Sequence, residues 1–359
     1  MNICIFNGDM SRGGGTERMA QILAEVLSKQ NRGKIFLLSL NYFSGKTFFP
    51  IPDEVIHEHL PGKSYREKVC GLTRFLRREK IEILIDVDIS LAIFSLPAIL
   101  FMPQIKLISW EMFHLNHNIG SRLTGLLRVL SLFRSSAYIC LTRQDLRNFR
   151  TKMPYRSPLV LIRNPAPEPL PEHCYDPDSG IIMTAGNFFP SKGWDLAMET
   201  AQIVLAKHPD WKWHFYGDGP LLEECKQKIK TLRLEKQIIF CGRVPDFPEQ
   251  LQSAALYVMT SRSEGFGLVL TEAKSRRIPV IAFDVETGPG EIIEHGISGF
   301  LVPPFQVPIM AERICELIQN REKRLDFSIH SCDNLPSFSL KRFSTRWEIL
   351  LNRITKGKK

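Results

Sequence analysis

Short apolar runs alternate with segments of helical periodicity along nearly all of this 359-residue chain, and this alternation most constrains the fold. In the first half the apolar runs are residues 3–6, 35–39, 81–86, 106–110, 138–142 and 159–163. Between the first two runs, residues 16–29 carry apolar side chains at helical spacing, which predicts an amphipathic helix. Strands this short and apolar are typical of a parallel sheet with helices on both faces. The first half therefore predicts a doubly wound α/β domain.

A proline-rich stretch, residues 164–180, interrupts the alternation. It suits neither a helix nor a central strand, so we expect an interdomain linker. The alternation then restarts, with apolar runs at residues 181–185, 213–216, 238–241, 256–260, 280–283 and 300–302. The predicted parts are an N-terminal Rossmann-like domain (1–164), a linker (165–179), a C-terminal Rossmann-like domain (180–339) and a closing helix (340–359). Ligands bind beyond the carboxyl ends of such strands, so we expect the ligand in a cleft between the domains.

The composition, 44% hydrophobic and 24% charged, is that of a folded globular protein. The eight cysteines are scattered without a Cys-x-x-Cys pair, which favours reduced thiols in the cytoplasm. We expect no signal peptide and no membrane span, since no uncharged apolar run approaches the ~20 residues that a span needs. The net charge of +9 points to anionic partners.

The strongest motif follows the apolar run that ends near residue 260. Its glycines, Gly265 and Gly267, allow close backbone approach, and a helix predicted to begin at Leu268 offers unpaired N–H groups to an anion. Glu264 precedes the loop, and Glu272 lies in the early turns of the helix, where a carboxylate can bind a ribose diol. The alternative is that Glu272 only favours the helix dipole.

Glu264 and Glu272, separated by seven residues, resemble the paired glutamates of retaining glycosyltransferases of family four. Residues 216–221, 287–293 and 295–302 also resemble that family, and the likeness is densest from 186 to 304. The resemblance implies the GT-B fold, which has two facing Rossmann-like domains. It also implies a nucleotide-sugar donor in the C-terminal domain, no required metal or other cofactor, and a closing helix that returns to the N-terminal domain.

The resemblance further implies a set of donor-binding residues. These are Gly14, Gly15, Gly186, Asn187, Lys192, Gly217, Arg243, Glu264, Gly265, Phe266, Gly267, Leu268 and Glu272. Lys192 matches a family lysine on the donor diphosphate, but Asn187 stands where the family has arginine. One lost electrostatic donor can cost on the order of 3 kcal/mol in the transition state. Either another cation, for which Arg243 is our candidate, replaces it, or the donor or the activity differs from the family's.

The glycines of the first loop, Gly14 and Gly15, resemble a family element near the donor phosphates or the acceptor. The alternative is a plain strand–helix connection, because the loop lacks the G-x-G-x-x-G spacing. The predicted catalytic residues are Glu264, Lys192, Glu111 and His114. The family commonly has a histidine in the loop that follows residue 110; some relatives place it at the position of Met112, so Glu111 ranks before His114. A histidine at a strand end can also be a purely structural hydrogen-bonding residue.

Two patterns resemble metal sites and are discounted. Asp86 and Asp88 form a D-x-D that fits a strand cap in this setting, and His57 and His59 have no evident third ligand. We therefore expect no metal ion. The chain also contains neither an H-E-x-x-H nor a G-x-S-x-G motif.

Residues 122–156 hold seven arginines and one lysine against one aspartate, and leucines interleave with Arg122, Arg128 and Arg134. The pattern predicts an amphipathic helix with leucines inward and these arginines towards an anionic membrane or a lipid-diphosphate acceptor. A solvated basic face is the alternative. Nucleic-acid binding competes as an explanation of the charge, but no nucleic-acid-binding motif supports it.

Together these features predict a glycosyltransferase that moves a hexose or N-acetylhexosamine from a nucleotide-diphosphate sugar, such as a UDP-sugar, to a saccharide acceptor. We expect the acceptor to be lipid-linked and the product to be a bacterial surface polysaccharide or lipopolysaccharide such as O-antigen. The enzyme would be peripheral on the cytoplasmic face of the inner membrane. The alternatives are an inactive or nucleotide-sugar-binding homologue, a GT-B-fold epimerase, or a glycosidase with two carboxylates roughly 5–9.5 Å apart.

Overall fold

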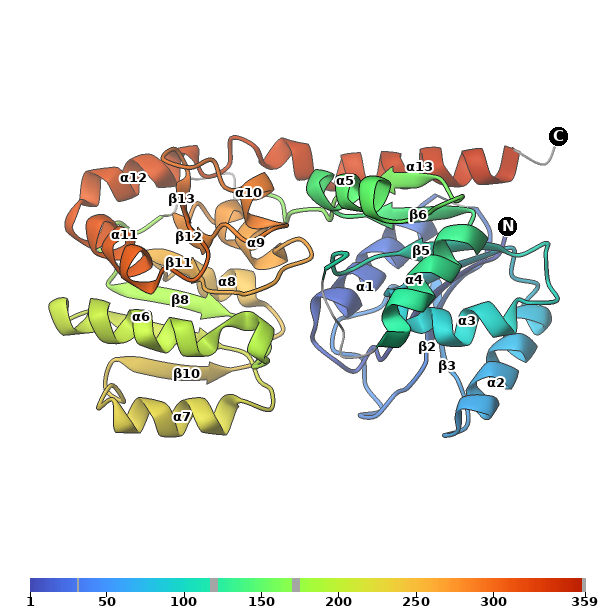
Figure 1. The fold of residues 1–359 in the computed structure, drawn as a ribbon, viewed down its shortest axis with the longest axis horizontal. Helices are drawn as coiled ribbons and strands as arrows, with labels where there is room; N and C mark the ends of the chain where they lie inside the picture. Colours follow the sequence, from blue (N-terminus) through green and yellow to red (C-terminus); the bar gives the residue numbers. More distant parts are fainter. Residues whose placement is uncertain (31, 117–121, 170–174, 357–359) are drawn as a thin grey trace. The chain divides into compact units, whose positions relative to one another are not determined.

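The computed structural model describes residues 1–30, 32–116, 122–169 and 175–356 (Figure 1). Its residue contacts divide the chain into two compact units. The N-terminal unit comprises residues 1–164 together with 341–359, and the C-terminal unit comprises residues 165–340. Each unit is a parallel sheet covered by helices, so the predicted α/β fold class is confirmed.

The described part of the N-terminal unit contains a parallel sheet with the strand order β3-β2-β1-β4-β5-β6-β7. The strands are β1 (Ile3–Asn7), β2 (Ile35–Ser39), β3 (Val55–His59), β4 (Ile83–Val87), β5 (Lys106–Trp110), β6 (Ala137–Cys140) and β7 (Leu159–Leu161). Strands β1, β2 and β4 are buried at every residue, which explains their continuous apolar sequence. Successive strands are added to one side of β1 as far as β3 and then to its other side from β4 onward, so the strand order reverses between β1 and β4. Ligands of such sheets bind at this reversal.

Strand β3 was not predicted because it does not read as an apolar run. It lies at the sheet edge, pairs only with β2 among the described strands, and carries His57, Glu58 and His59. An edge strand tolerates polar residues because it is not covered on both sides. The His57 ring lies 3.0 Å from the Ser39 hydroxyl, and the Tyr42 ring contacts both histidines.

The helices of the N-terminal unit are α1 (Gly15–Ser28), α2 (Tyr65–Arg78), α3 (Ala92–Ala98), α4 (Arg122–Arg134), α5 (Arg143–Lys152) and α13 (Leu340–Lys356), with the short helix η1 (Ile89–Leu91) before α3. Helix α13 is the last described element and packs on this unit, where Trp347 contacts Trp110 with ring centroids 5.1 Å apart. Arg32 also donates a hydrogen bond to Asn352 at 2.9 Å.

The C-terminal unit contains a second parallel sheet, with the order β10-β9-β8-β11-β12-β13 among the described strands. The strands are β8 (Ile181–Ala185), β9 (Lys212–Tyr216), β10 (Ile238–Gly242), β11 (Leu256–Met259), β12 (Val280–Phe283) and β13 (Gly299–Val302). The order reverses between the neighbouring strands β8 and β11. Every apolar run predicted in this half became a strand, shifted by at most one residue at either end.

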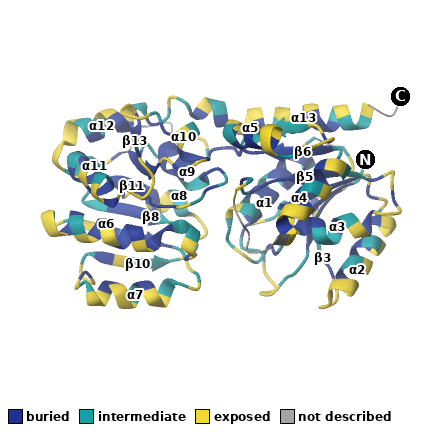
Figure 2. Cartoon of the chain, viewed as in Figure 1, coloured by how far each residue is buried: buried dark blue, intermediate teal, exposed yellow. Residues whose placement is uncertain are grey.

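The helices of the C-terminal unit are α6 (Trp194–Lys207), α7 (Leu222–Thr231), α8 (Phe247–Leu251), α9 (Leu268–Ser275), α10 (Pro289–Ile292), α11 (Val307–Gln319) and α12 (Arg321–His330), with the short helices η2 (Pro190–Lys192) and η3 (Leu335–Phe338). Figure 2 shows the sheet buried beneath them. The rings of Phe188 and Trp194 stack with centroids 3.8 Å apart, which fixes the loop between β8 and α6 on the core. Within the described residues, no helix has both the length and the apolar character needed to cross a membrane.

Candidate functional site

Two loops meet at the carboxyl ends of β8 and β11, where the strand order of the C-terminal sheet reverses. The loop after β8 carries Gly186, Asn187 and Lys192, and the loop after β11 carries residues 261–267. The Arg262 amide donates to the Ser191 carbonyl at 2.8 Å, so the two loops are directly joined. This is the position at which a doubly wound sheet binds its ligand. The structure therefore brings together the two strongest sequence motifs.

Lys192 and Glu264 form an ion pair across these loops. The lysine Nζ lies 2.7 Å from Glu264 Oε1, and the two side chains are 30% and 7% exposed. Glu264 is also held through its backbone, because its carbonyl accepts a hydrogen bond from the Thr287 hydroxyl. The lysine thus keeps contact with solvent while its partner is fixed. An incoming anion can reach the lysine and compete with Glu264 for it.

Asn187, which replaces the expected arginine, has a cation beside it. Arg243 follows β10 and donates from Nη2 to Asn187 Oδ1 at 3.2 Å. The Asn187 carbonyl accepts from the Trp194 indole at 3.1 Å, so the asparagine backbone is fixed on the stacked aromatic pair. Arg243 thus lies beside position 187, and its role as the replacement cation stays a prediction.

Glycine is required at two turns of this site. A Cβ atom at Gly217, which follows β9, would lie 1.9 Å from the Gly186 carbonyl oxygen, closer than any real contact. Gly267 forms the N-cap of α9 with φ of 92°, a conformation that side chains disfavour. The other predicted residues of this loop differ in access: Phe266 is buried against Phe338, whereas Gly265 and Leu268 are partly exposed. Phe266 can therefore offer a ligand only its backbone.

Helix α9 carries Glu272, partly buried, and is anchored by a lysine that the sequence reasoning missed. Lys274 is fully buried and donates to the Ile292 carbonyl at 3.0 Å and to the Ser298 hydroxyl at 2.7 Å. Burial lowers the pKa of this lysine to about 8. The Asn334 amide donates to the same Ile292 carbonyl at 2.9 Å. The bonds of Lys274 fix α9 to the end of α10 and to the segment after it. No local sequence pattern predicts them, since the partners are distant in sequence.

The corresponding edge of the N-terminal sheet carries carboxylates instead of cations. Gly14 is the N-cap of α1, and Gly15 begins the helix. The carboxylate of Glu17 folds back over them: a Cβ atom at Gly14 would lie 2.5 Å from Glu17 Oε2. Burial raises the pKa of Glu17. Asp88, after β4, has its pKa raised to about 6 by burial and by the charges of Glu111 and Glu17. A phosphate at Gly14 and Gly15 would meet these acids, although Arg12 of the same loop lies close enough to lower the pKa of Glu17 in part. The donor role of the two glycines stays a prediction.

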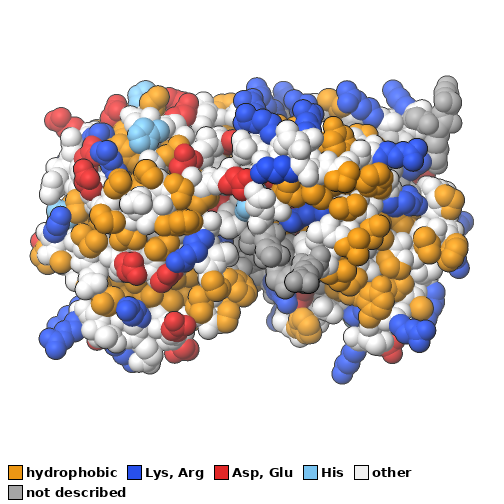
Figure 3. All heavy atoms as spheres, viewed as in Figure 1, with side chains coloured by type: hydrophobic (Ala, Val, Ile, Leu, Met, Phe, Trp, Pro, Cys, Tyr) orange, Lys and Arg blue, Asp and Glu red, His pale blue; other side chains and the backbone are white. Residues whose placement is uncertain are grey.

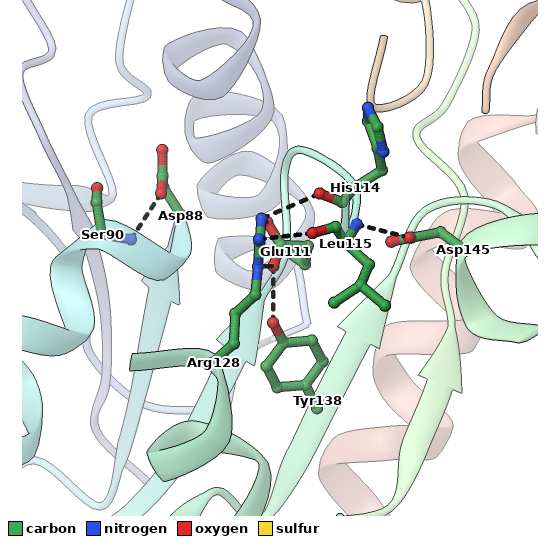
Figure 4. A network of polar contacts seen from close by, with 8 residues as sticks. All are labelled: Asp88, Ser90, Glu111, His114, Leu115, Arg128, Tyr138 and Asp145. Atoms are coloured by element: carbon green, nitrogen blue, oxygen red, sulfur yellow. Dashed lines mark hydrogen bonds and ion pairs between the residues drawn. The ribbon is translucent and has the colours of Figure 1, made fainter. Parts of the chain in front are cut away.

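Glu111, predicted to be catalytic, lies at the centre of a closed network (Figure 4). Its side chain is 0% exposed, and its Oε2 atom accepts from Arg128 Nε at 2.9 Å and from the Tyr138 hydroxyl at 2.7 Å. In this structure Glu111 is an internal counter-charge to Arg128, and its catalytic role stays a prediction.

Arg128 extends the same network to the loop after β5. Its guanidinium donates to the carbonyls of His114 at 3.0 Å and Leu115 at 2.8 Å. The Leu115 amide in turn donates to Asp145 at 2.9 Å. Figure 4 shows the His114 ring directed away from Arg128, so the backbone of His114 belongs to the network while its ring points elsewhere. His114 is 6% exposed and remains a predicted catalytic residue.

The expected orientation of α4 is wrong. Arg128 is 4% exposed, whereas Leu126 and Leu130 are 53% and 45% exposed. The reason is that Glu111 needs an internal cation, and the helix turns Arg128 inward to supply it. Arg134 is partly exposed, and the side chain of Arg122 lies outside the described residues. Leu127 and Leu132 face inward as predicted, whereas Arg128 and the exposed leucines do not have the places predicted for them.

The D-x-D pattern has the structural role that was expected. Asp88 accepts from the Ser90 amide at 2.8 Å and caps η1, and buried Asp86 accepts from the Ser95 hydroxyl. Among the described residues, no group of three or more His, Cys, Asp or Glu side chains is placed to hold a metal ion.

The chain is similar to known glycosyltransferases in sequence and in structure. Residues 172–331 match the family model described as Glycosyl transferases group 1. An uncharacterized glycosyltransferase of Haemophilus influenzae is 27% identical over 97% of this chain and 99% of its own length. The amylovoran biosynthesis glycosyltransferase AmsD of Erwinia amylovora is 25% identical over 96% of this chain and 97% of its own length. The structure of HepE from Anabaena, solved with UDP, superposes with a TM-score of 0.81 at 18% identity, covering 98% of this chain and 100% of that one.

Two parallel-sheet α/β units and the structural similarity define the GT-B fold. With the family match and the full-length relatives, the chain is a glycosyltransferase of this fold, related to enzymes of polysaccharide biosynthesis.

Proposed function

We propose that this protein transfers a hexose or N-acetylhexosamine from a UDP-sugar to a saccharide acceptor during assembly of a bacterial surface polysaccharide. The proposal rests on two cations that lie at the loops where the C-terminal sheet reverses. Lys192 is partly exposed and Arg243 is exposed. HepE, which shares the fold, has been solved with UDP, and AmsD is named for amylovoran biosynthesis. Both support the proposal.

The donor diphosphate binds between these cations and the N-terminus of α9. Lys192 then exchanges Glu264 for a phosphate oxygen, and Arg243 takes the place that the family gives to an arginine at position 187. The N–H groups that follow Gly267 add an uncharged anion site at the start of the helix. Glu272, on the same helix, binds the ribose hydroxyls.

The leaving group determines what these residues do for the reaction. Cleavage of the sugar–phosphate bond increases the negative charge on the departing diphosphate, so cations already in place stabilise the transition state more than the ground state. When Lys192 moves to the phosphate, the Glu264 carboxylate is released to accept hydrogen bonds from the sugar, next to the backbone of Gly265 to Gly267. We further propose that the anomeric configuration is retained, that no metal ion is required and that the acceptor is linked to a lipid at the cytoplasmic face of the inner membrane.

Ligand binding without added metal tests the donor site. UDP, GDP, ADP and CMP and their sugar conjugates are compared by thermal shift, since a ligand that binds only the native state stabilises it by about 2.7 kcal/mol at a hundredfold excess over Kd. We expect a selective shift with UDP and one UDP-sugar. No shift with any nucleotide would overturn the proposal, and a donor that binds and is epimerised without an acceptor would replace transfer by epimerisation.

A further inference from the structure

Helix α4 exposes a stripe of large apolar side chains. Leu123, Leu126, Leu130 and Phe133 recur at helical spacing along one face and are 42%, 53%, 45% and 51% exposed. We call these four residues the apolar stripe. Figure 3 shows hydrophobic side chains gathered over α4 and α3 on the drawn face of the N-terminal unit. A continuous stripe differs from the singly scattered apolar residues that any surface carries.

The opposite face of α4 is fixed inside the unit, so the apolar stripe cannot turn inward. Leu132 and Ser131 are 0% exposed, and Leu127 is 7% exposed. Arg128 holds the helix by its bonds to Glu111 and to the carbonyls of the loop after β5. Rotation of α4 would hide the leucines only by leaving Glu111 without its cation.

Helix α4 and the segment that carries it are poor in negative charge. Between Asp88 and Asp145 the sequence contains a single carboxylate, Glu111, which is buried and neutralised by Arg128. Asp88 caps η1, which contacts α4, and Asp145 is buried. The same segment contains Lys106, Arg122, Arg134 and Arg143 besides Arg128. An amphipathic helix with protruding leucines, a phenylalanine and arginines but no acids suits the interface of an anionic bilayer.

We propose that the apolar stripe of α4 inserts into the headgroup region of an anionic membrane. The leucines and the phenylalanine enter between the lipids, and the more exposed arginines of the segment, Arg134 and Arg143, meet the phosphates. A second copy of the chain fits less well, because a two-fold contact between identical stripes would bring arginines together without a carboxylate to pair them. The inference extends the proposed use of a lipid-linked acceptor, but it does not depend on the donor site.

Sedimentation with vesicles tests the apolar stripe. The full chain is mixed with vesicles of phosphatidylcholine alone, or of equal parts phosphatidylcholine and phosphatidylglycerol. We expect sedimentation with the mixed vesicles, and at least about tenfold weaker partition for the double variant Leu126→Gln, Leu130→Gln. The matched control is Ile329→Gln on α12, since Ile329 is 50% exposed but belongs to the C-terminal unit. It should sediment like the unchanged protein.

Two further measurements keep the result interpretable. Thermal melting should be unchanged in the double variant, because exposed leucines contribute little to folding, and an unchanged melt excludes misfolding as the cause of weaker sedimentation. The UDP shift should also be unchanged, so failure of membrane binding and failure of the donor site are separate outcomes. Equal sedimentation of the double variant and the unchanged protein, or no sedimentation of either, would overturn the proposal. So would a dimer in solution that the double variant abolishes, because the stripe would then bind a second copy.

Discussion

Each unit contains an ion pair at the carboxyl edge of its sheet, and the two pairs differ in access to solvent. Arg128 and Glu111 in the N-terminal unit are 5% and 0% exposed, whereas Lys192 and Glu264 in the C-terminal unit are 30% and 7% exposed. Breaking a buried ion pair leaves an unpaired charge inside the protein, which is costly, but a partly exposed lysine can change partners. Burial therefore distinguishes a pair that holds a loop from a pair that can receive a ligand.

The charges around the two pairs differ in the same direction. The N-terminal edge gathers carboxylates, including Glu17 and Asp88, whose pKa values are raised by burial. The C-terminal edge has Lys192 and Arg243 at its loops. A diphosphate carries negative charge, so electrostatics favour the C-terminal unit as its site. The acidic edge is better suited to neutral sugar hydroxyls.

Removing Arg128 should produce the largest effect. Arg128→Met leaves Glu111 buried without a cation, which should lower the free energy of unfolding by about 3–5 kcal/mol. Denaturant unfolding measures the change. Lys192→Met is the matched control at the more exposed pair, and we expect a loss of at most about 1 kcal/mol there. Equal losses in the two variants would mean that burial does not separate the pairs.

Lys192→Met, which should cost little stability, should have a large effect on activity. Lys192→Met removes one cation from the departing diphosphate, so turnover of the donor should fall by roughly 10²–10³-fold. Initial rates with the UDP-sugar selected by thermal shift give the value. Arg262→Gln is the control, because Arg262 lies in the same loops but is bound at 2.6 Å to Asp195. Near-normal turnover without Lys192 would remove the lysine from the diphosphate site.

Asp86, a buried carboxyl group in the N-terminal unit, predicts how the stability of this unit depends on pH. Burial raises the pKa of Asp86 to about 7, from an ordinary value near 4. The folded protein therefore binds this proton more tightly than the unfolded chain, so Asp86 lowers stability as pH rises from about 4 to about 7. Asp86→Asn should remove this loss and raise stability at pH 8 by up to about 4 kcal/mol, with little change at pH 4.

Melting curves at the two pH values measure this difference. Asp88→Asn is the comparison, because Asp88 is only partly buried and its pKa is raised less, to about 6. A gain at pH 8 no larger than at pH 4 would show that Asp86 is not the group that titrates.

The fold could be read from the sequence because its strands are buried on both faces. Continuous apolar runs marked β1, β2 and β12, and turn chemistry separated them. The edge strand β3 was not predicted, since only its first two residues are apolar and residues 57–59 are polar. The loops of the C-terminal site were predictable for a related reason: glycine at positions 217 and 267 is required by local geometry, which the sequence displays directly.

The orientation of α4 could not be read in this way. Leucines and arginines alternate along it, so its sequence alone does not say which side faces the core. Glu111, distant in sequence and fully buried, decides the matter by pairing with Arg128. Long-range ion pairs leave no periodic signal, and Lys274 was missed for that reason.

The smallest expected effect concerns Arg243 at the C-terminal site. It tests whether a cation at one position of this site can replace a cation at another. Arg243→Gln should weaken UDP binding about tenfold, which corresponds to about 1.4 kcal/mol. Isothermal titration calorimetry measures the change.

The second variant, Asn187→Arg in the Arg243→Gln background, places a cation at position 187, where the sequence resemblance leads us to expect arginine, and it should restore most of the affinity. The 3.2 Å contact between Arg243 and Asn187 brings the two positions within reach of one phosphate group. Restoration would show that the site requires charge rather than a particular residue; weak binding by both variants would show that Arg243 acts through loop geometry instead.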